Sequence, residues 1–89
     1  MLYPFLTLVD DTEIVHTEVL EDGSVKVRAE TPYFDGFKHM VISLPSYRIL
    51  EVKNYTCDEF ENYLRVIRST EHLIFRFAKR GGFENAAAV

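Results

Sequence analysis

The side chains best suited to bind a metal or transfer a proton at neutral pH are the three histidines, His16, His39 and His72. A zinc site needs three or four ligands, commonly in close pairs such as Cys-x-x-Cys or His-x-x-x-His. The histidines are widely separated in the chain, and no such pair occurs. We therefore predict that the chain binds no metal ion.

Cys57 is the single cysteine, and it falls at the expected start of a helix. The N-terminus of a helix can favour the thiolate form and make a cysteine reactive. Asp58, Glu59 and Glu61 crowd the same end and oppose a thiolate. The sequence also lacks the P-loop, G-x-G-x-x-G and G-x-S-x-G motifs. We therefore predict an inert Cys57, no catalytic residue, no cofactor and no enzymatic activity.

The stretch "STEHLIFRFAKRGGFEN" mixes aromatic and basic residues, as strands that stack on RNA do. Those strands carry glycines within the run, whereas Gly81 and Gly82 follow it here. The weaker nucleic-acid candidates of the chain are Arg65, Arg68, Arg76, Lys79 and Arg80. We interpret them as the solvated face of a helix, because charge runs on helices usually serve that purpose.

Length and charge limit the class of protein. The 89 residues suffice for one domain, residues 1–89, and 47% of them are hydrophobic, which predicts a folded core. The net charge is −4, with three basic and eight acidic residues in the first 45 positions. Nucleic-acid-binding domains usually carry a net basic charge, so this total argues against a nucleic-acid partner.

The cysteine count and the N-terminus indicate a compartment. A lone cysteine forms no disulfide within the chain, which favours a reducing environment. The opening "MLYPFLTLV" is apolar, but it lacks the basic residues of a signal peptide and meets Asp10 too early to span a membrane. We expect a cytoplasmic protein without a membrane partner.

The segment from about residue 2 to 53 predicts an antiparallel meander of four to five strands. Short runs rich in β-branched and aromatic residues alternate with turn residues. If the fifth run, "YRILEVK", forms a strand, Leu50 and Val52 face inward. With Asp10-Asp11 as a two-residue loop, Leu6 lies opposite Val15.

The turn at Asp22-Gly23 allows two registers. A two-residue loop would bury His16 among valines. A three-residue loop with Gly23 in the left-handed conformation places Val15 opposite Ala29 on the core face and His16 beside Arg28 on the other. We choose the second register because it separates apolar from polar side chains.

This register leaves the face of the sheet away from the helix incompletely polar. It gathers an apolar cluster there, formed by Tyr3, Phe5, Ile14 and His16. Exposed apolar patches mark sites of protein association. We therefore predict this cluster as the partner surface, unless the tail "GGFENAAAV" or the loop "TPYFDGF" covers it.

Residues 57–80 predict a C-terminal helix. Thr56 and Glu59 have the spacing of a capping box, and apolar residues recur with helical periodicity through the segment. A single straight helix of this length would measure about 36 Å and overhang a small sheet. The sequence leaves open whether it is one helix or a pair broken near Ser69-Thr70.

These observations predict an α+β fold: the meander, packed by the C-terminal helix or broken helix pair. The function that we expect is a non-catalytic protein-interaction module that self-associates, as a dimer, or binds another protein. The alternative is a regulatory or antitoxin-like protein that contacts nucleic acid or a basic partner through its C-terminal helix.

The opening "MLYP" and the acidic strand region are similar to HicB-like antitoxins. The similarity covers only a few residues, and the family's downstream Pro-Gly loop is missing from this chain. It therefore supports no family assignment.

Overall fold

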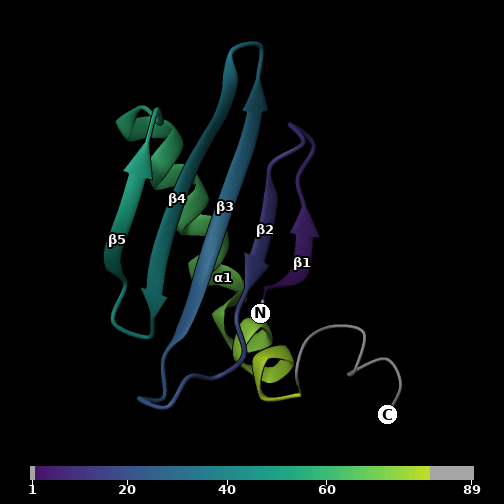
Figure 1. Cartoon of the computed structure of the whole chain (residues 1–89), viewed down its shortest axis with the longest axis vertical. Coiled ribbons are helices and arrows are strands. Elements are labelled where there is room, and N and C mark those ends of the chain that lie inside the picture. Colours follow the sequence, from purple (N-terminus) through teal and green to yellow (C-terminus); the bar gives the residue numbers. More distant parts are fainter. Residues whose placement is uncertain (1, 81–89) are drawn as a thin grey trace.

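The computed structural model describes residues 2–80, which form a five-stranded sheet and one helix (Figure 1). All neighbouring strands pair antiparallel in the order β1-β2-β3-β4-β5. The elements are β1 (Tyr3–Thr7), β2 (Glu13–His16), β3 (Val25–Tyr33), β4 (Gly36–Leu44), β5 (Arg48–Lys53) and α1 (Cys57–Lys79). The predicted α+β meander with a C-terminal helix is confirmed, including the fifth strand.

The core lies between the sheet and α1. Every second residue of β3 and β4 turns towards the helix, and this face of the sheet is called the inner face below. The fully buried strand residues include Val25, Val27, Ala29, Met40, Ile42 and Leu44. The helix contributes Tyr63, Ile67, Ile74 and Ala78, whose spacing places them on one side of a helix. The other face of the sheet, the open face, is turned away from α1.

The hairpin between β2 and β3 adopts neither predicted register. Ile14 lies opposite Ala29, and His16 lies opposite Val27. Gly23 has the expected left-handed conformation, with a φ of 83°. The three-residue loop closes as predicted, with the Leu20 N–H donating to the carbonyl of Ser24 at 2.8 Å. The pairing then shifts by one residue before Thr17, whose hydroxyl accepts the N–H of Lys26 at 3.1 Å. The slip exchanges the faces of β2 relative to our prediction.

The first hairpin also differs by one residue. Its loop holds three residues, because Leu8 N–H donates to the carbonyl of Thr12 at 2.9 Å. Leu6 therefore lies opposite Ile14 rather than Val15. A β-bulge at Phe5 interrupts the pairing between Pro4 and Leu6.

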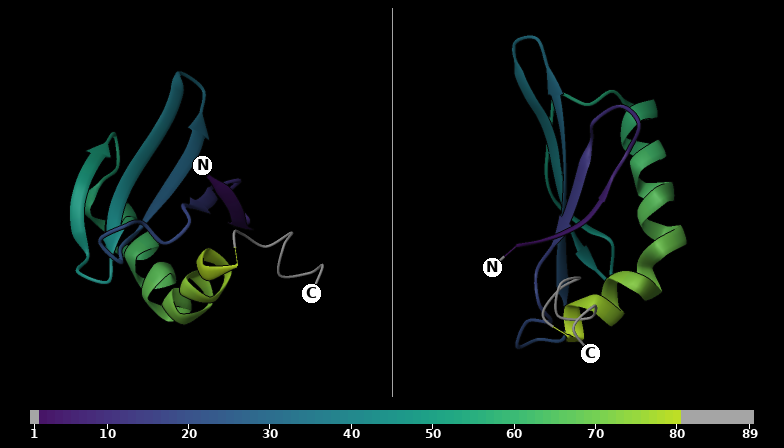
Figure 2. Two further views of the ribbon diagram at one scale, coloured as in Figure 1. Left: turned by 60° about the horizontal axis from the view of Figure 1, so that its bottom comes forward. Right: turned by 90° about the vertical axis from the view of Figure 1, so that its right-hand side faces the viewer.

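The C-terminal segment is one helix of 23 residues rather than two. The predicted capping box is present, with Glu59 N–H donating to the Thr56 hydroxyl at 3.2 Å. The helix curves around the sheet (Figure 2), so its length does not overhang. The hydroxyls of Ser69 and Thr70 both donate to the carbonyl of Val66, at 2.8 and 2.9 Å, a type of contact that bends helices.

The expected stop signal, Gly81-Gly82, lies outside the described residues, as does the tail that follows it. Within residues 2–80, no helix is both long enough and apolar enough to cross a membrane.

Candidate functional site

The predicted partner surface is not an exposed patch. Ile14 and His16 are only 1% and 0% exposed, because the register slip turns both towards α1. The Phe5 ring packs 6.1 Å from the His16 ring and 5.9 Å from that of Phe77 on the helix, measured between ring centres. Tyr3 lies 5.8 Å from His16 by the same measure. Our placement of this cluster was wrong: it packs between β1, β2 and the end of α1.

The two edges of the sheet differ in how open they are. β1 is short, contains Pro4 and is interrupted by a bulge, and these features discourage further strand pairing. All six residues of β5 are exposed, and no described segment pairs with its outer edge. Its large apolar side chains remain 53% exposed at Ile49, 41% at Leu50 and 42% at Val52. The β5 edge is therefore the candidate surface for protein association.

The side chains of β5 divide between the two faces. Ile49 lies opposite Ile42 and Val52 opposite Met40, so both turn towards the inner face. The other four residues turn towards the open face: Arg48, Leu50, Glu51 and Lys53. The prediction was right for Val52 and wrong for Leu50, because a bulge in β5 adds a residue opposite β4.

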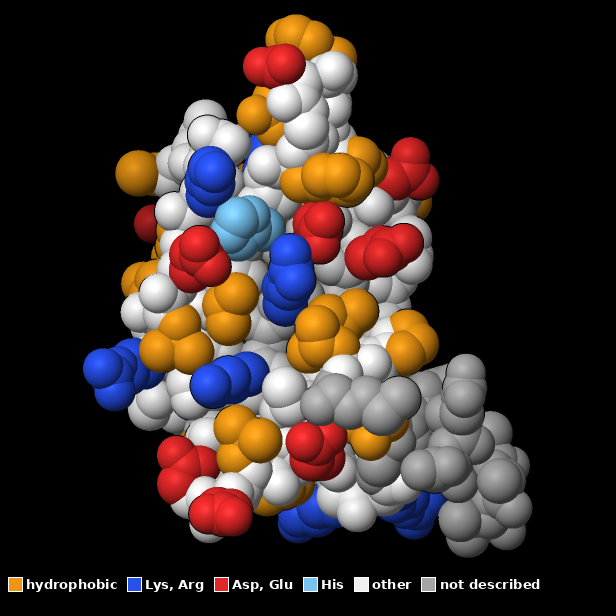
Figure 3. Space-filling view, in the orientation of Figure 1, with side chains coloured by type: hydrophobic (Ala, Val, Ile, Leu, Met, Phe, Trp, Pro, Cys, Tyr) orange, Lys and Arg blue, Asp and Glu red, His pale blue; other side chains and the backbone are white. Residues whose placement is uncertain are grey.

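The open face is mixed in charge. Acidic, basic and hydrophobic side chains alternate across it (Figure 3). Two contacts lie within the face: Arg28 forms an ion pair with Glu30 at 3.2 Å, and the His39 ring lies 3.2 Å from the Glu51 carboxylate. A solvated face of this kind differs from the inner layer, where the hydrophobic core residues gather.

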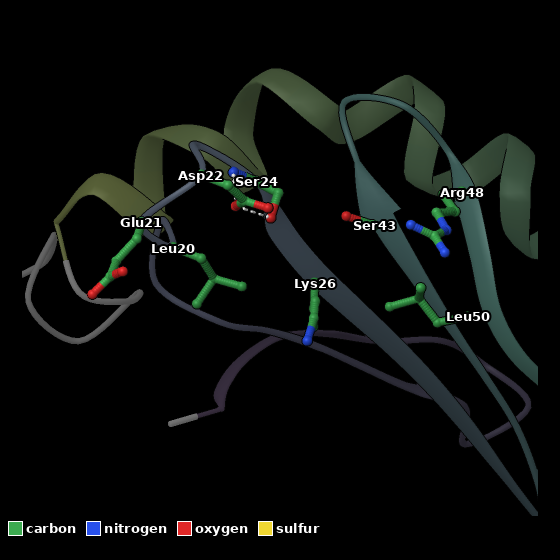
Figure 4. Close-up of a pocket in the computed structure, with 8 residues that line it drawn as sticks. All are labelled: Leu20, Glu21, Asp22, Ser24, Lys26, Ser43, Arg48 and Leu50. Atoms are coloured by element: carbon green, nitrogen blue, oxygen red, sulfur yellow. Dashed lines mark hydrogen bonds between the residues drawn. The ribbon is translucent and has the colours of Figure 1, made fainter.

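A hollow of about 550 Å³ lies at one end of the open face. Leu20, Lys26 and Leu50 extend into it on the side away from α1 (Figure 4). Lys26, Ser43 and Arg48 stand opposite one another on three neighbouring strands, so two cations flank one hydroxyl. Sequence reasoning missed this row, because it arises from pairings between distant segments.

The acidic rim of the hollow counters these cations. Glu21 and Asp22 line it as well. Hydrogen bonds from the hydroxyl and the backbone N–H of Ser24, at 2.6 and 3.0 Å, lower the pKa of Asp22. Asp22 therefore stabilises the turn through its bonds to Ser24. Because cations and carboxylates both line the hollow, it favours neither an anionic nor a cationic ligand.

A polar cluster ties the first hairpin to the helix. The Tyr63 hydroxyl donates to Asp10 at 2.6 Å and accepts from the Thr12 hydroxyl at 3.1 Å. Thr31 bridges Thr12 and Tyr55, at 2.6 and 2.8 Å. Burial raises the pKa of Tyr55 to about 12, so its hydroxyl stays protonated at neutral pH. The cluster therefore supports the fold and offers no acid or base poised near neutrality.

The remaining predicted residues lie apart from one another. Cys57 is exposed at the first position of α1. His16 is buried, whereas His39 is on the open face and His72 is exposed on the helix. Among residues 2–80, no three metal-ligating side chains come together.

The five cations of the C-terminal segment lie on one side of α1. Arg65, Arg68, Arg76, Lys79 and Arg80 are all exposed, on the side of the helix opposite its buried residues. We call these five residues the basic stripe. The structure thus brings the five nucleic-acid candidates together on one surface. It buries Ile14 and His16, two of the four residues of the predicted partner surface.

Comparison of the chain with protein families, with curated proteins and with solved structures found no match.

Proposed function

We propose that the chain is a non-catalytic protein-interaction module that self-associates by pairing β5 antiparallel with β5 of a second copy. The observation that carries this proposal is β5, whose outer edge pairs with no described segment and which carries three half-exposed apolar side chains. Open edges of this kind bind further strands through main-chain hydrogen bonds. The lone cysteine suits a reducing cytoplasm.

The inner-face side chains of β5 explain what an added strand contributes. Ile49 and Val52 point towards the helix layer, yet 53% and 42% of their surfaces stay in water. The hydrophobic layer between the sheet and α1 therefore leaves apolar side chains exposed to water at this edge. A strand that pairs with β5 and turns apolar side chains to the same face removes this surface from water.

The face pattern of β5 favours a second copy of the chain as that strand. Because of the bulge, Ile49 and Val52 turn to the inner face and the other four residues of β5 turn to the open face. The order of the two faces along residues 48–53 is therefore the same from either end. A two-fold axis between Leu50 and Glu51 then places residues of the same face opposite each other. Ile49 meets the partner's Val52 on the inner face, and the contact occurs twice because two-fold interfaces are isologous.

One contact of this arrangement is unfavourable. Arg48 meets the partner's Lys53 at each end of the paired strands, and like charges directly opposite each other destabilise a sheet. Salt screens such exposed repulsion. Self-association should therefore strengthen as salt is raised.

The test measures the dimer dissociation constant by sedimentation of the full chain. Lys53→Glu replaces two repulsive pairs with two attractive ones, so we expect roughly tenfold tighter association. Ile49→Lys places a charge on the inner face of the edge and should leave a folded monomer. Val9→Lys is the matched control, because Val9 is 106% exposed and lies outside the strands.

A monomeric wild-type chain at high concentration would contradict the proposal. So would a dimer that Ile49→Lys and Val9→Lys leave equally intact, since association would then use another surface. Circular dichroism of each variant separates loss of association from loss of folding.

A further inference from the structure

We infer that the basic stripe of α1 binds the phosphate backbone of a duplex nucleic acid, without reading its sequence. This goes beyond self-association through β5, because the stripe lies on the helix and not on the sheet edge.

The stripe is a continuous surface. The buried helix residues Tyr63, Ile67 and Ile74 recur every four or seven positions and define the side that faces the sheet. Arg65, Arg68, His72, Arg76 and Lys79 recur every three or four positions on the other side, and all five are exposed. At 1.5 Å per residue, Arg65 and Lys79 lie about 21 Å apart along the helix.

The stripe has few carboxylates to neutralise it. The acidic residues Asp58 and Glu59 lie in the first turn of the helix, and Glu61, one turn before Arg65, lines a hollow together with Arg65 and Arg68. Glu71 is the one acidic residue between Arg65 and Arg80, and it accepts the Tyr47 hydroxyl at 2.5 Å. Among residues 2–80, no ion pair joins a carboxylate to any cation of the stripe.

The net charge of −4 does not show that acidic and basic residues lie in different parts of the molecule. Most acidic residues belong to the strands and their turns, whereas the basic stripe lies along α1. A polyanion that approaches the helix side meets the cations first. The whole-chain total is therefore a poor guide to this surface, although it argued against a nucleic-acid partner in the sequence. Local basic stripes are the electrostatic signature of nucleic-acid binding.

The composition of the stripe selects the ligand class. Protein interfaces have an apolar centre with aromatic anchors, whereas protein–DNA interfaces are polar and positively charged. The exposed residues among the cations are Ser69 and His72, which are polar. Single-strand binding relies on aromatic side chains that stack on successive bases. Between Arg65 and Arg80, Phe75 and Phe77 are half-buried, and His72 is the one exposed ring. A duplex backbone fits this surface best.

Arginine supplies four of the five cations, and its planar guanidinium matches phosphate oxygens in a bidentate way. Arg68 is held 4.9 Å above the Tyr47 ring, which orders its side chain while leaving it exposed. Three to five phosphate contacts predict a slope of about −2.7 to −4.5 when log affinity is plotted against log salt.

The experiment uses fluorescence anisotropy with a labelled duplex of about two helical turns and mixed sequence, titrated with the full chain between 25 and 200 mM salt. We expect binding that weakens with the slope given above. Arg76→Glu should reduce affinity at least tenfold, and Arg65→Glu should do the same. Lys26→Glu is the matched control: it makes the same change of charge on the open face, and affinity should stay within twofold.

Several results would overturn the inference: no binding at 25 mM salt, an equal loss with Lys26→Glu, or tighter binding of a single strand. Competition by polyglutamate as strong as that by unlabelled duplex would assign the stripe to an acidic protein instead. Ile49→Lys should still bind the duplex, so failure of self-association and failure of duplex binding can be told apart.

Discussion

At the scale of single residues, a few buried hydroxyls hold distant segments together. Tyr63 lies on the helix and is 4% exposed, yet its hydroxyl bonds to Asp10 and Thr12 of the first hairpin. Such a group must keep its partners, because a buried polar atom without one costs about 1–3 kcal/mol. Phe5 links distant segments by packing: its ring, on β1, contacts the ring of Phe77 near the C-terminal end of α1.

The first prediction concerns the Tyr63 hydroxyl. Tyr63→Phe leaves the ring in place but removes a donor to Asp10 and an acceptor for Thr12. We expect the free energy of unfolding to fall by about 1–3 kcal/mol, which lowers the melting temperature by several degrees. Thermal unfolding followed by circular dichroism measures the change.

Tyr33→Phe is the control for this prediction. The Tyr33 hydroxyl accepts from Asn54 at 3.2 Å at an exposed position, so its loss should cost little. Equal melting temperatures for the two variants would show that the buried cluster contributes no more than a surface hydrogen bond.

At the scale of elements, the helix shows how local signals and tertiary contacts combine. The capping box starts α1 at the expected residue, and Glu59 additionally accepts from Lys38 on β4 at 2.8 Å. The hydrogen bonds of Ser69 and Thr70 to Val66 accompany the curve that keeps the helix against the sheet. The position suspected of breaking the helix bends it instead.

The second prediction concerns the helix cap. Thr56→Ala removes the side-chain acceptor for the N–H of Glu59, which should destabilise the chain by about 1 kcal/mol. The shift of the urea midpoint, at an unchanged slope, reports this loss. Thr56→Ser keeps the hydroxyl and should stay close to wild type. If both variants lose the same stability, the methyl group of Thr56 matters and the cap does not.

At the scale of the whole molecule, carboxylates link separate parts of the chain and make its stability depend on pH. The bond from Lys38, together with that from the Thr56 N–H, lowers the pKa of Glu59. Burial alone would raise the pKa of Asp10, but hydrogen bonds from Tyr63 and Thr12 outweigh it and lower the pKa.

The third prediction follows from these directions. A carboxyl whose pKa is lower in the folded state stabilises the fold above its unfolded pKa, and this contribution is lost as pH falls through the folded value. We expect the urea midpoint to hold steady from pH 7 to about 5 and to fall below pH 4. Glu59→Gln should start lower at pH 7 and fall less steeply in acid. A midpoint that rises on acidification would contradict this assignment.

How much of this could be read from the sequence depends on the range of each interaction. The period of two in β3 and β4, the helical period in α1 and the capping box are local patterns, so they predicted the elements and their order. The registers failed because they depend on the conformation of loops and strand ends. The three-residue loop before Thr12 shifts the first hairpin by one position, and the second hairpin shifts by one position between Leu20 and Thr17, although its loop has the predicted length.

The candidate surfaces show the same division. By itself the sequence determined the fold class, the start of the helix and the spacing that places five cations on one side of it, because these follow from backbone geometry within a segment. Only the tertiary structure decided that Ile14 and His16 are buried and that β5 is the open edge. A strand's outer neighbour and its inward face are set by pairings between distant residues, and a slip of one residue reverses them.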